Sequence, residues 1–168
     1  MLHLSHRWRR AATAVGVAAI TAVIGAATAT AATRSAPAVS GTEHIQVLSA
    51  APSGPATAIA YGAFTAAGRA HFGGGKVGKL AFPGGTIVLT HTAGKGSEHF
   101  NPATCLSTIR QPGSFRITSG SGRYAGISGH GTYELSLLIL GTRAHGACSS
   151  AKPAGQQELL ELTGHVRL

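Results

Sequence analysis

A glycine-dense segment from Gly120 to Gly131 constrains the fold of this chain more than any other feature. It lies between two stretches of alternating polarity, Ser114–Thr118 and Thr132–Leu137. Such alternation is typical of β-strands, and glycines let a chain reverse direction through positive φ angles. We interpret Tyr124, at the centre of the segment, as an aromatic plug beneath the joint. The segment therefore predicts two antiparallel strands and an all-β architecture.

The same alternation recurs along most of the chain. We expect strands over Thr57–Thr65, Lys76–Phe82, Thr86–Thr92, Thr104–Gln111, Gly113–Ser119, Thr132–Leu140 and Gln156–Leu168. Thr, Val and Ile are frequent in these segments, and Gly and Pro separate them. Seven or eight short strands indicate a sandwich or a barrel, and closing the sheet removes its exposed edges. The sequence thus predicts a single antiparallel β-barrel of about eight strands, preceded by a signal helix.

The first 32 residues predict an export signal peptide. Arg7, Arg9 and Arg10 precede an uncharged stretch, Ala11–Thr33, whose Ala-Thr-Ala triplets fit the small-residue cleavage pattern. An uncleaved membrane anchor is the alternative, although Ala, Thr and Gly are weakly apolar for a span of roughly 20 residues. We therefore expect a secreted protein, and we leave open whether it stays associated with the cell envelope.

Two further segments follow the predicted signal. Residues 33–56 combine linker-type Pro, Ser and Gly with one short apolar patch, and they predict a flexible arm. The Glu43–Leu48 portion of this arm can add an edge strand. Residues 57–168 have the size of one domain, which we assign to the barrel.

Composition excludes several kinds of site. The chain has no aspartate, and its five acidic residues are all glutamate. This removes the usual orienting acid of a Ser-His-Asp triad and the Asp-rich loops that bind Ca²⁺. Seven histidines follow the signal without metal-ligand spacing, so we expect no metal and no cofactor.

The chain is basic, with a formal net charge of +9. Such charge attracts anionic partners, of which cell-wall polymers suit an exported protein. The alternative is that dispersed charge serves solubility alone. The basic residues form no runs and alternate with no aromatic residues, so specific binding of nucleic acid is not expected.

Cys105 and Cys148 are the two cysteines of the chain. In an exported protein, two cysteines most simply form one disulfide. A free catalytic thiol is the alternative, and it would need a neighbouring base such as His99 or His145.

Three segments carry a resemblance to a known family: Phe82–His91 (FPGGTIVLTH), Asn101–Cys105 (NPATC) and Gly122–Gly126 (GRYAG). Together they resemble small exported bacterial proteins similar to the allene oxide cyclase barrel family, whose relatives include the plant dirigent proteins. The resemblance covers about residues 57–168. It implies an eight-stranded antiparallel barrel with an apolar cavity, which in enzymatic members steers a reactive intermediate to one product. Dirigent-type sites rely on aspartates, which are absent here, so no catalytic residue is carried over.

Three residues are candidates for a site. Glu134 would be a general acid or base if its side chain pointed into the barrel, because burial raises the pKa of a carboxyl. The alternation of polarity in its strand favours a Glu134 side chain that points to solvent, because Tyr133 and Leu135 form the more apolar face. Tyr61 and Tyr133 are the candidate ligand-binding residues.

Three functions remain open at this stage. The first is a non-catalytic exported barrel that binds a small apolar or amphipathic ligand or serves as an envelope-associated module. The second is a cyclase- or isomerase-like enzyme that uses Glu134 with nearby Tyr or His residues. The third is a cationic structural protein that adheres to anionic polymers of the cell wall.

Overall fold

The computed structural model describes residues 39–50, 55–73, 75–149 and 153–168, and the predicted signal peptide lies outside these ranges. Within them the chain is all-β apart from one 3₁₀ turn. Its elements are β1 (Ser40–Ser49), β2 (Ala56–Gly62), β3 (Ala66–Phe72), β4 (Val77–Phe82), β5 (Gly85–Ala93), β6 (Ser97–Asn101), β7 (Leu106–Gly120), η1 (Gly122–Tyr124), β8 (Ser128–Leu140), β9 (Thr142–Ala144), β10 (Ala147–Ser149) and β11 (Gly155–Arg167).

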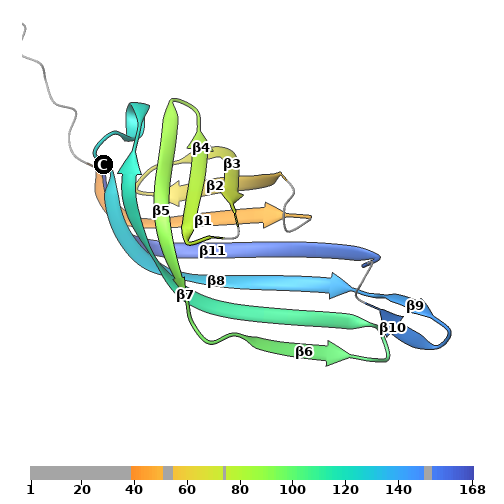
Figure 1. The fold of residues 1–168 in the computed structure, drawn as a ribbon. Helices are drawn as coiled ribbons and strands as arrows, with labels where there is room; N and C mark the ends of the chain where they lie inside the picture. The colour runs from red at the N-terminus through yellow and green to blue at the C-terminus, as the bar shows by residue number, and fades with distance from the viewer. Residues whose placement is uncertain (1–38, 51–54, 74, 150–152) are drawn as a thin grey trace, which may run out of the picture. The chain divides into compact units, whose positions relative to one another are not determined.

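Eight of the strands close into an antiparallel barrel. Around the barrel the order is β5-β4-β3-β2-β1-β11-β8-β7, and pairing of β5 with β7 closes the ring (Figure 1). Each strand turns alternate residues toward the interior, so Ile45 and Val47 of β1 face Leu162 and Leu160 of β11 across the sheet. The prediction of a single antiparallel barrel of about eight strands is confirmed.

The barrel begins earlier in the sequence than predicted. Strand β1 pairs with β2 on one side and with β11 on the other, so it is an internal strand and not an edge strand. The predicted arm over residues 33–56 is therefore wrong for Ser40–Ser49, and the predicted barrel boundary at residue 57 is too late in the sequence. The physical reason is that Glu43, Ile45 and Val47 alternate at period two and are all buried.

Strand β7 is continuous where two strands were predicted. Pro112 was expected to separate them, because proline cannot donate a ladder hydrogen bond. Here Pro112 lies where β7 changes neighbours, since β6 pairs as far as Arg110 and β5 pairs from Gly113. The Pro112 carbonyl accepts a 2.8 Å hydrogen bond from the Gly94 amide on that edge. The proline nitrogen faces the same edge, so no hydrogen bond to β8 is lost.

Four strands were not expected from the sequence. In β3, small and polar residues supply little apolar alternation beyond Phe72. All five residues of β6 are exposed, so neither of its faces shows an apolar signal. The hairpin strands β9 and β10 have three residues each, too few to show a period.

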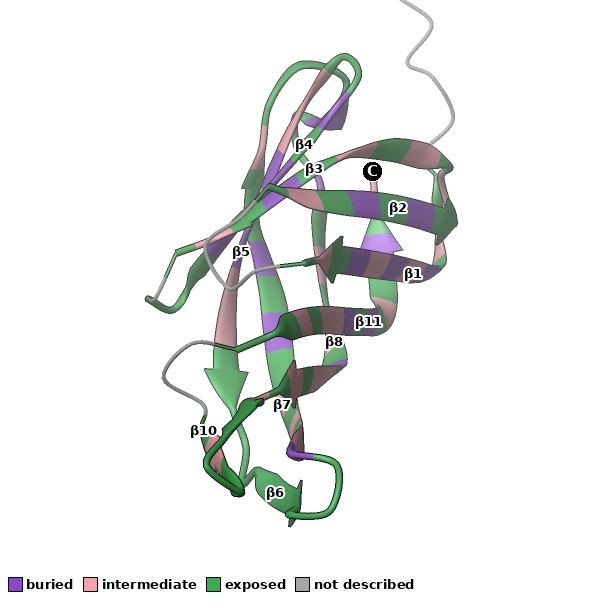
Figure 2. Cartoon of the chain, turned by 90° about the vertical axis from the view of Figure 1, so that its right-hand side faces the viewer, coloured by how far each residue is buried: buried purple, intermediate pink, exposed green. Residues whose placement is uncertain are grey.

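Three barrel strands continue past the barrel as an open sheet. The first half of β7, the second half of β8 and the start of β11 form this extension, and β6 is its outer strand. Figure 1 shows these strands running together beyond the barrel toward the β9–β10 hairpin. In Figure 2 burial is concentrated in the barrel, whereas β6 is exposed along its length.

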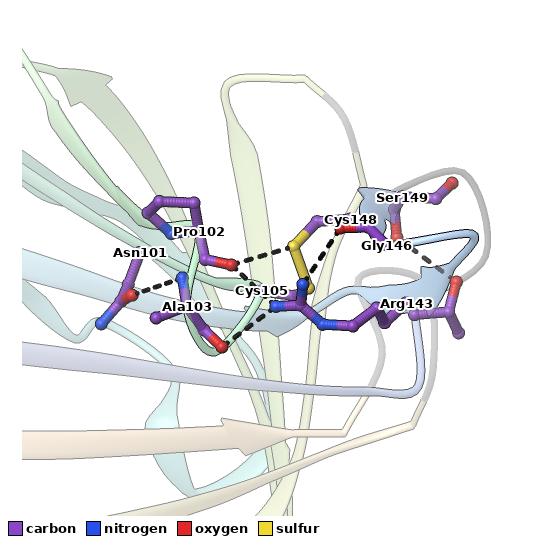
Figure 3. The surroundings of a disulfide bond; sticks show 9 residues. Asn101, Pro102, Ala103, Cys105, Arg143, Gly146, Cys148 and Ser149 are labelled. Carbon is purple, nitrogen blue, oxygen red and sulfur yellow. Dashed lines mark hydrogen bonds between the residues drawn. A yellow bond between two sulfur atoms is a disulfide. The ribbon is translucent and has the colours of Figure 1, made fainter.

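A disulfide ties the extension to the β9–β10 hairpin. The sulfur atoms of Cys105 and Cys148 are 2.00 Å apart, which confirms the predicted bond. The Arg143 guanidinium adds a second tie, because it donates hydrogen bonds to the carbonyl oxygens of Pro102 at 2.8 Å and Ala103 at 3.0 Å (Figure 3). Both ties join the hairpin to the β6–β7 turn.

One end of the barrel is filled by aromatic side chains. The Tyr124 ring, 1% exposed, lies 5.4 Å from the Phe64 ring and 5.9 Å from the Phe82 ring. Gly122 adopts a φ of +60°, which lets the glycine-rich joint turn back over this end. The Glu43 carboxylate beside these rings accepts a 3.0 Å hydrogen bond from the Phe64 amide. We call this the closed end, and its plug has the structure that the sequence predicts.

Candidate functional site

The opposite end of the barrel is hollow. A cavity of about 270 Å³ lies at this open end, where the barrel meets the extension. Strands β3, β5, β7, β8 and β11 and the β3–β4 loop supply its walls. The lining residues are Phe72, Gly73, Gly75, Leu89, His91, Gln111, Tyr133, Leu135, Glu158, Leu160 and Leu162. Most of these are apolar or aromatic, as is usual for the pocket of a small molecule.

Three rings contact one another in series at this cavity. The His91 ring contacts Phe72 at 6.1 Å and Tyr133 at 6.0 Å, in both cases edge to face. The outer two rings each cover a glycine on the neighbouring strand, because Phe72 pairs with Gly78 and Tyr133 pairs with Gly113. A Cβ atom at either glycine would overlap the ring opposite it. The two glycines therefore let the rings lie flat against the barrel wall and leave the centre open.

The polar groups of the cavity are few. Among the described residues, the buried Nε2 atom of His91 has no hydrogen-bond partner. Burial raises the pKa of the Glu158 carboxyl above its ordinary value, and burial likewise raises the pKa of the Tyr133 phenol. A buried polar atom without a partner costs free energy, so a ligand that supplies a partner here gains affinity.

A second depression, of about 440 Å³, lies on the outer wall of the barrel and brings the three predicted site residues together. Tyr61, 43% exposed, stacks on His44 with ring centres 5.1 Å apart. Tyr133 lines this depression as well as the cavity, although its side chain is only 8% exposed. Glu134 contributes from the outward face of β8.

Several polar groups of the outer depression have partners, either within it or beside it. The Arg110 guanidinium lies 3.0 Å from the Glu134 carboxylate, and both side chains are more than half exposed. The Gln46 amide donates to the Glu161 carboxylate at 3.1 Å. Catalysis inside the barrel would require Glu134 to point inward, and its side chain points to solvent, as the alternation of β8 favoured. The outer depression is therefore a paired polar surface with no group placed as a lumenal acid or base.

His91 and Glu158 were not singled out from the sequence. Glu158 shares a strand face with Leu160 and Leu162, so period-two alternation carried on by two residues would have placed its carboxyl inside the barrel. His91 follows Ile87 and Leu89 on the inner face of β5, so the same alternation would have placed its imidazole inside the barrel. An inward-facing ionisable residue at the end of an apolar strand face was the pattern to look for.

Two kinds of feature are absent from the described part of the chain. Within residues 39–50, 55–73, 75–149 and 153–168, no three His, Cys, Asp or Glu side chains are grouped to hold a metal ion. The same residues include no helix of the length and hydropathy needed to span a membrane.

Comparison with known proteins adds no assignment. No protein-family model matches the chain, and no curated protein or solved structure matches it either.

Proposed function

We propose that this protein is an exported, non-catalytic β-barrel that binds a small apolar or amphipathic molecule in the cavity at its open end. The observation that carries the proposal is the hollow between Phe72, His91 and Tyr133, which contrasts with the solid packing at the other end of the same barrel. A cavity bordered by leucines and rings binds apolar groups by removing their surface from water.

The volume of the cavity bounds the ligand. A water molecule occupies about 30 Å³ of liquid, so 270 Å³ corresponds to about nine waters. The ligand, or the part of it that enters the barrel, therefore has on the order of ten non-hydrogen atoms. This is at the small end of the range for ligand pockets, roughly 300–1,000 Å³.

The proposed location is outside the cell. The Cys105–Cys148 disulfide is consistent with an oxidising compartment, where such bonds persist. The basic signal-like segment at the start of the sequence supports export. We also propose distant kinship with the allene oxide cyclase barrel family, supported by the three sequence segments quoted above and by the eight-stranded ring. A shared fold does not transfer a reaction, so the kinship assigns no activity.

Adhesion to anionic wall polymers is the second candidate, and one surface feature favours it. Arg116, His130 and His165 are direct cross-strand neighbours on the outer faces of β7, β8 and β11. Retention on isolated cell walls that falls steeply with added salt, and falls further for Arg116→Ala, would support adhesion. Retention that salt does not change would contradict it.

The ligand-binding proposal is tested by filling the cavity. Leu135→Trp adds a large ring to the cavity wall, whereas Leu138→Trp places the same ring on the outer face of the same strand, where Leu138 is 39% exposed. We expect the wild-type protein and Leu138→Trp to bind a neutral naphthylamine dye with one-to-one stoichiometry. Leu135→Trp should bind at least tenfold more weakly, with unchanged far-UV circular dichroism. No binding by the wild-type protein, or equal binding by both variants, would contradict the proposal.

A further inference from the structure

The polar groups of the open-end cavity indicate the kind of head group that it accepts. His91 reaches the cavity from β5 and Glu158 from β11, and Leu89, Leu160 and Leu162 line the space beside them. The Nε2 atom of His91 is buried without a hydrogen-bond partner. The His91 imidazole and the Glu158 carboxyl therefore face one apolar space from two different strands.

The charges at the cavity disfavour an anionic ligand. Among the described residues that line it, Glu158 is the sole carboxyl and there is no Lys or Arg. Burial among the apolar residues of this cavity raises the pKa of Glu158, because the location offers little solvation to a negative charge. A carboxylate ligand would add a second negative charge beside the first and would find no fixed cation.

We propose that the ligand is a small neutral molecule with an apolar body and a hydroxyl head, and that this hydroxyl lies between the His91 imidazole and the Glu158 carboxyl. The inference rests on the proposed function, because it concerns the same cavity. A hydroxyl is both a donor and an acceptor. It donates to the Glu158 carboxylate and accepts from the Nε2–H of His91, while the apolar body contacts the leucines. One head group thus satisfies both walls.

A set of ligands with one chain length tests this assignment. At pH 8, ligand-detected NMR titrations of the wild-type protein would compare 1-octanol, octanoate and octylamine. We expect 1-octanol to bind at least tenfold more tightly than octanoate and no more weakly than octylamine. If octanoate binds as tightly as the alcohol, or if the amine binds tenfold more tightly, the hydroxyl assignment is overturned while the apolar site stands. If none of the three ligands binds, both the proposed function and the hydroxyl assignment fail.

Two substitutions on β11 provide a matched pair for the same titrations. Glu158→Gln removes the carboxylate inside the cavity, whereas Glu161→Gln removes one from the outer face. Glu158→Gln should raise octanoate affinity roughly fivefold or more, because like-charge repulsion is relieved. Glu161→Gln should leave all three affinities unchanged. Equal effects of the two substitutions would overturn the placement of the head group.

A third substitution isolates the imidazole. His91→Phe keeps a ring between Phe72 and Tyr133 but removes Nε2. We expect 1-octanol to bind roughly three- to tenfold more weakly, the loss of about one hydrogen bond, and octane to bind unchanged. An equal loss for octane would show that the ring acts by packing alone and would overturn the hydrogen bond.

Discussion

The closed end and the open end of this barrel are each built around three rings, and the arrangement of the rings decides whether the end is solid. At the closed end, Phe64, Phe82 and Tyr124 form a triangle in which every pair is in contact, at 5.4, 5.9 and 6.2 Å. At the open end, the described ring contacts run in series from Phe72 to His91 to Tyr133. Three rings in mutual contact fill the closed end, whereas three rings in series border a cavity at the open end.

Each end also holds a carboxyl whose pKa is raised by burial. At the closed end, Glu43 is 2% exposed, and the amide of Phe64 donates to its carboxylate. At the open end, Glu158 faces the cavity. One oxygen of Glu43 is thus held by the backbone, although Oε1 is buried without a partner among the described residues. The two acids differ in their surroundings, because Glu43 lies among packed rings whereas Glu158 borders a space that a ligand can enter.

The largest expected effect comes from removing one ring at each end. Tyr124→Ala should cost roughly 3–5 kcal/mol in free energy of unfolding, because it removes one of the three packed rings and leaves a void at the closed end. Tyr133→Ala should cost roughly 2–3 kcal/mol, because its ring already borders a cavity. Urea denaturation would measure both. Only Tyr133→Ala should weaken binding of the dye, and an equal loss of binding in Tyr124→Ala would break the comparison.

The second prediction concerns the glycine that lets the Tyr133 ring lie against the wall. Gly113→Ala should cost roughly 1–3 kcal/mol and reduce dye affinity, because its Cβ would push the ring into the cavity. Gly155→Ala is the control, since a Cβ atom there meets nothing within 4 Å. Its stability should stay within about 0.5 kcal/mol of the wild-type value. Full dye binding by Gly113→Ala would contradict the account.

The third prediction concerns pH. Burial raises the pKa of Glu43, so the folded state binds this proton more tightly than the unfolded state does. The contribution of Glu43 to the free energy of unfolding is therefore fully present below the ordinary glutamate pKa of 4.5. It is lost as the pH rises through the pKa of Glu43 in the folded state. Relative to the wild-type protein, Glu43→Gln should become more stable as the pH rises from 4.5 through the folded-state pKa of Glu43, and the difference should then level off. Urea midpoints that stay a constant distance apart would contradict this.

The smallest expected effect lies on the outer wall, away from both ends. Arg110→Ala breaks an exposed ion pair with Glu134 and should change stability by about 0.5 kcal/mol or less. Neither Arg110→Ala nor Glu134→Gln should change dye affinity. A tenfold loss of affinity in Glu134→Gln would return that residue to the site and revive the enzymatic alternative.

The sequence predicted the barrel well because period-two alternation is strong where one strand face is buried, as in β8 and β11. It failed where the alternation is weak, as in β6, which is exposed on both faces. It also misjudged Pro112, since the cost of a proline depends on which neighbouring strand its nitrogen faces. Tyr133, a candidate ligand-binding residue from the sequence, lines the cavity, and its role in binding stays a prediction. His91 and Glu158 come to border the same cavity only when the ring of strands closes.

A ¹H–¹⁵N correlation spectrum of the full barrel, titrated with 1-octanol, tests the ligand site at the open end most directly. We predict saturable shifts in the amides of Leu89, Gln111, Leu135 and Leu160 around the cavity, and unchanged amides for Phe64 and Tyr124 at the closed end. Shifts centred on Tyr61 and Thr163 would move the site to the outer depression. That result, or a spectrum that does not change at all, would contradict a ligand site at the open end.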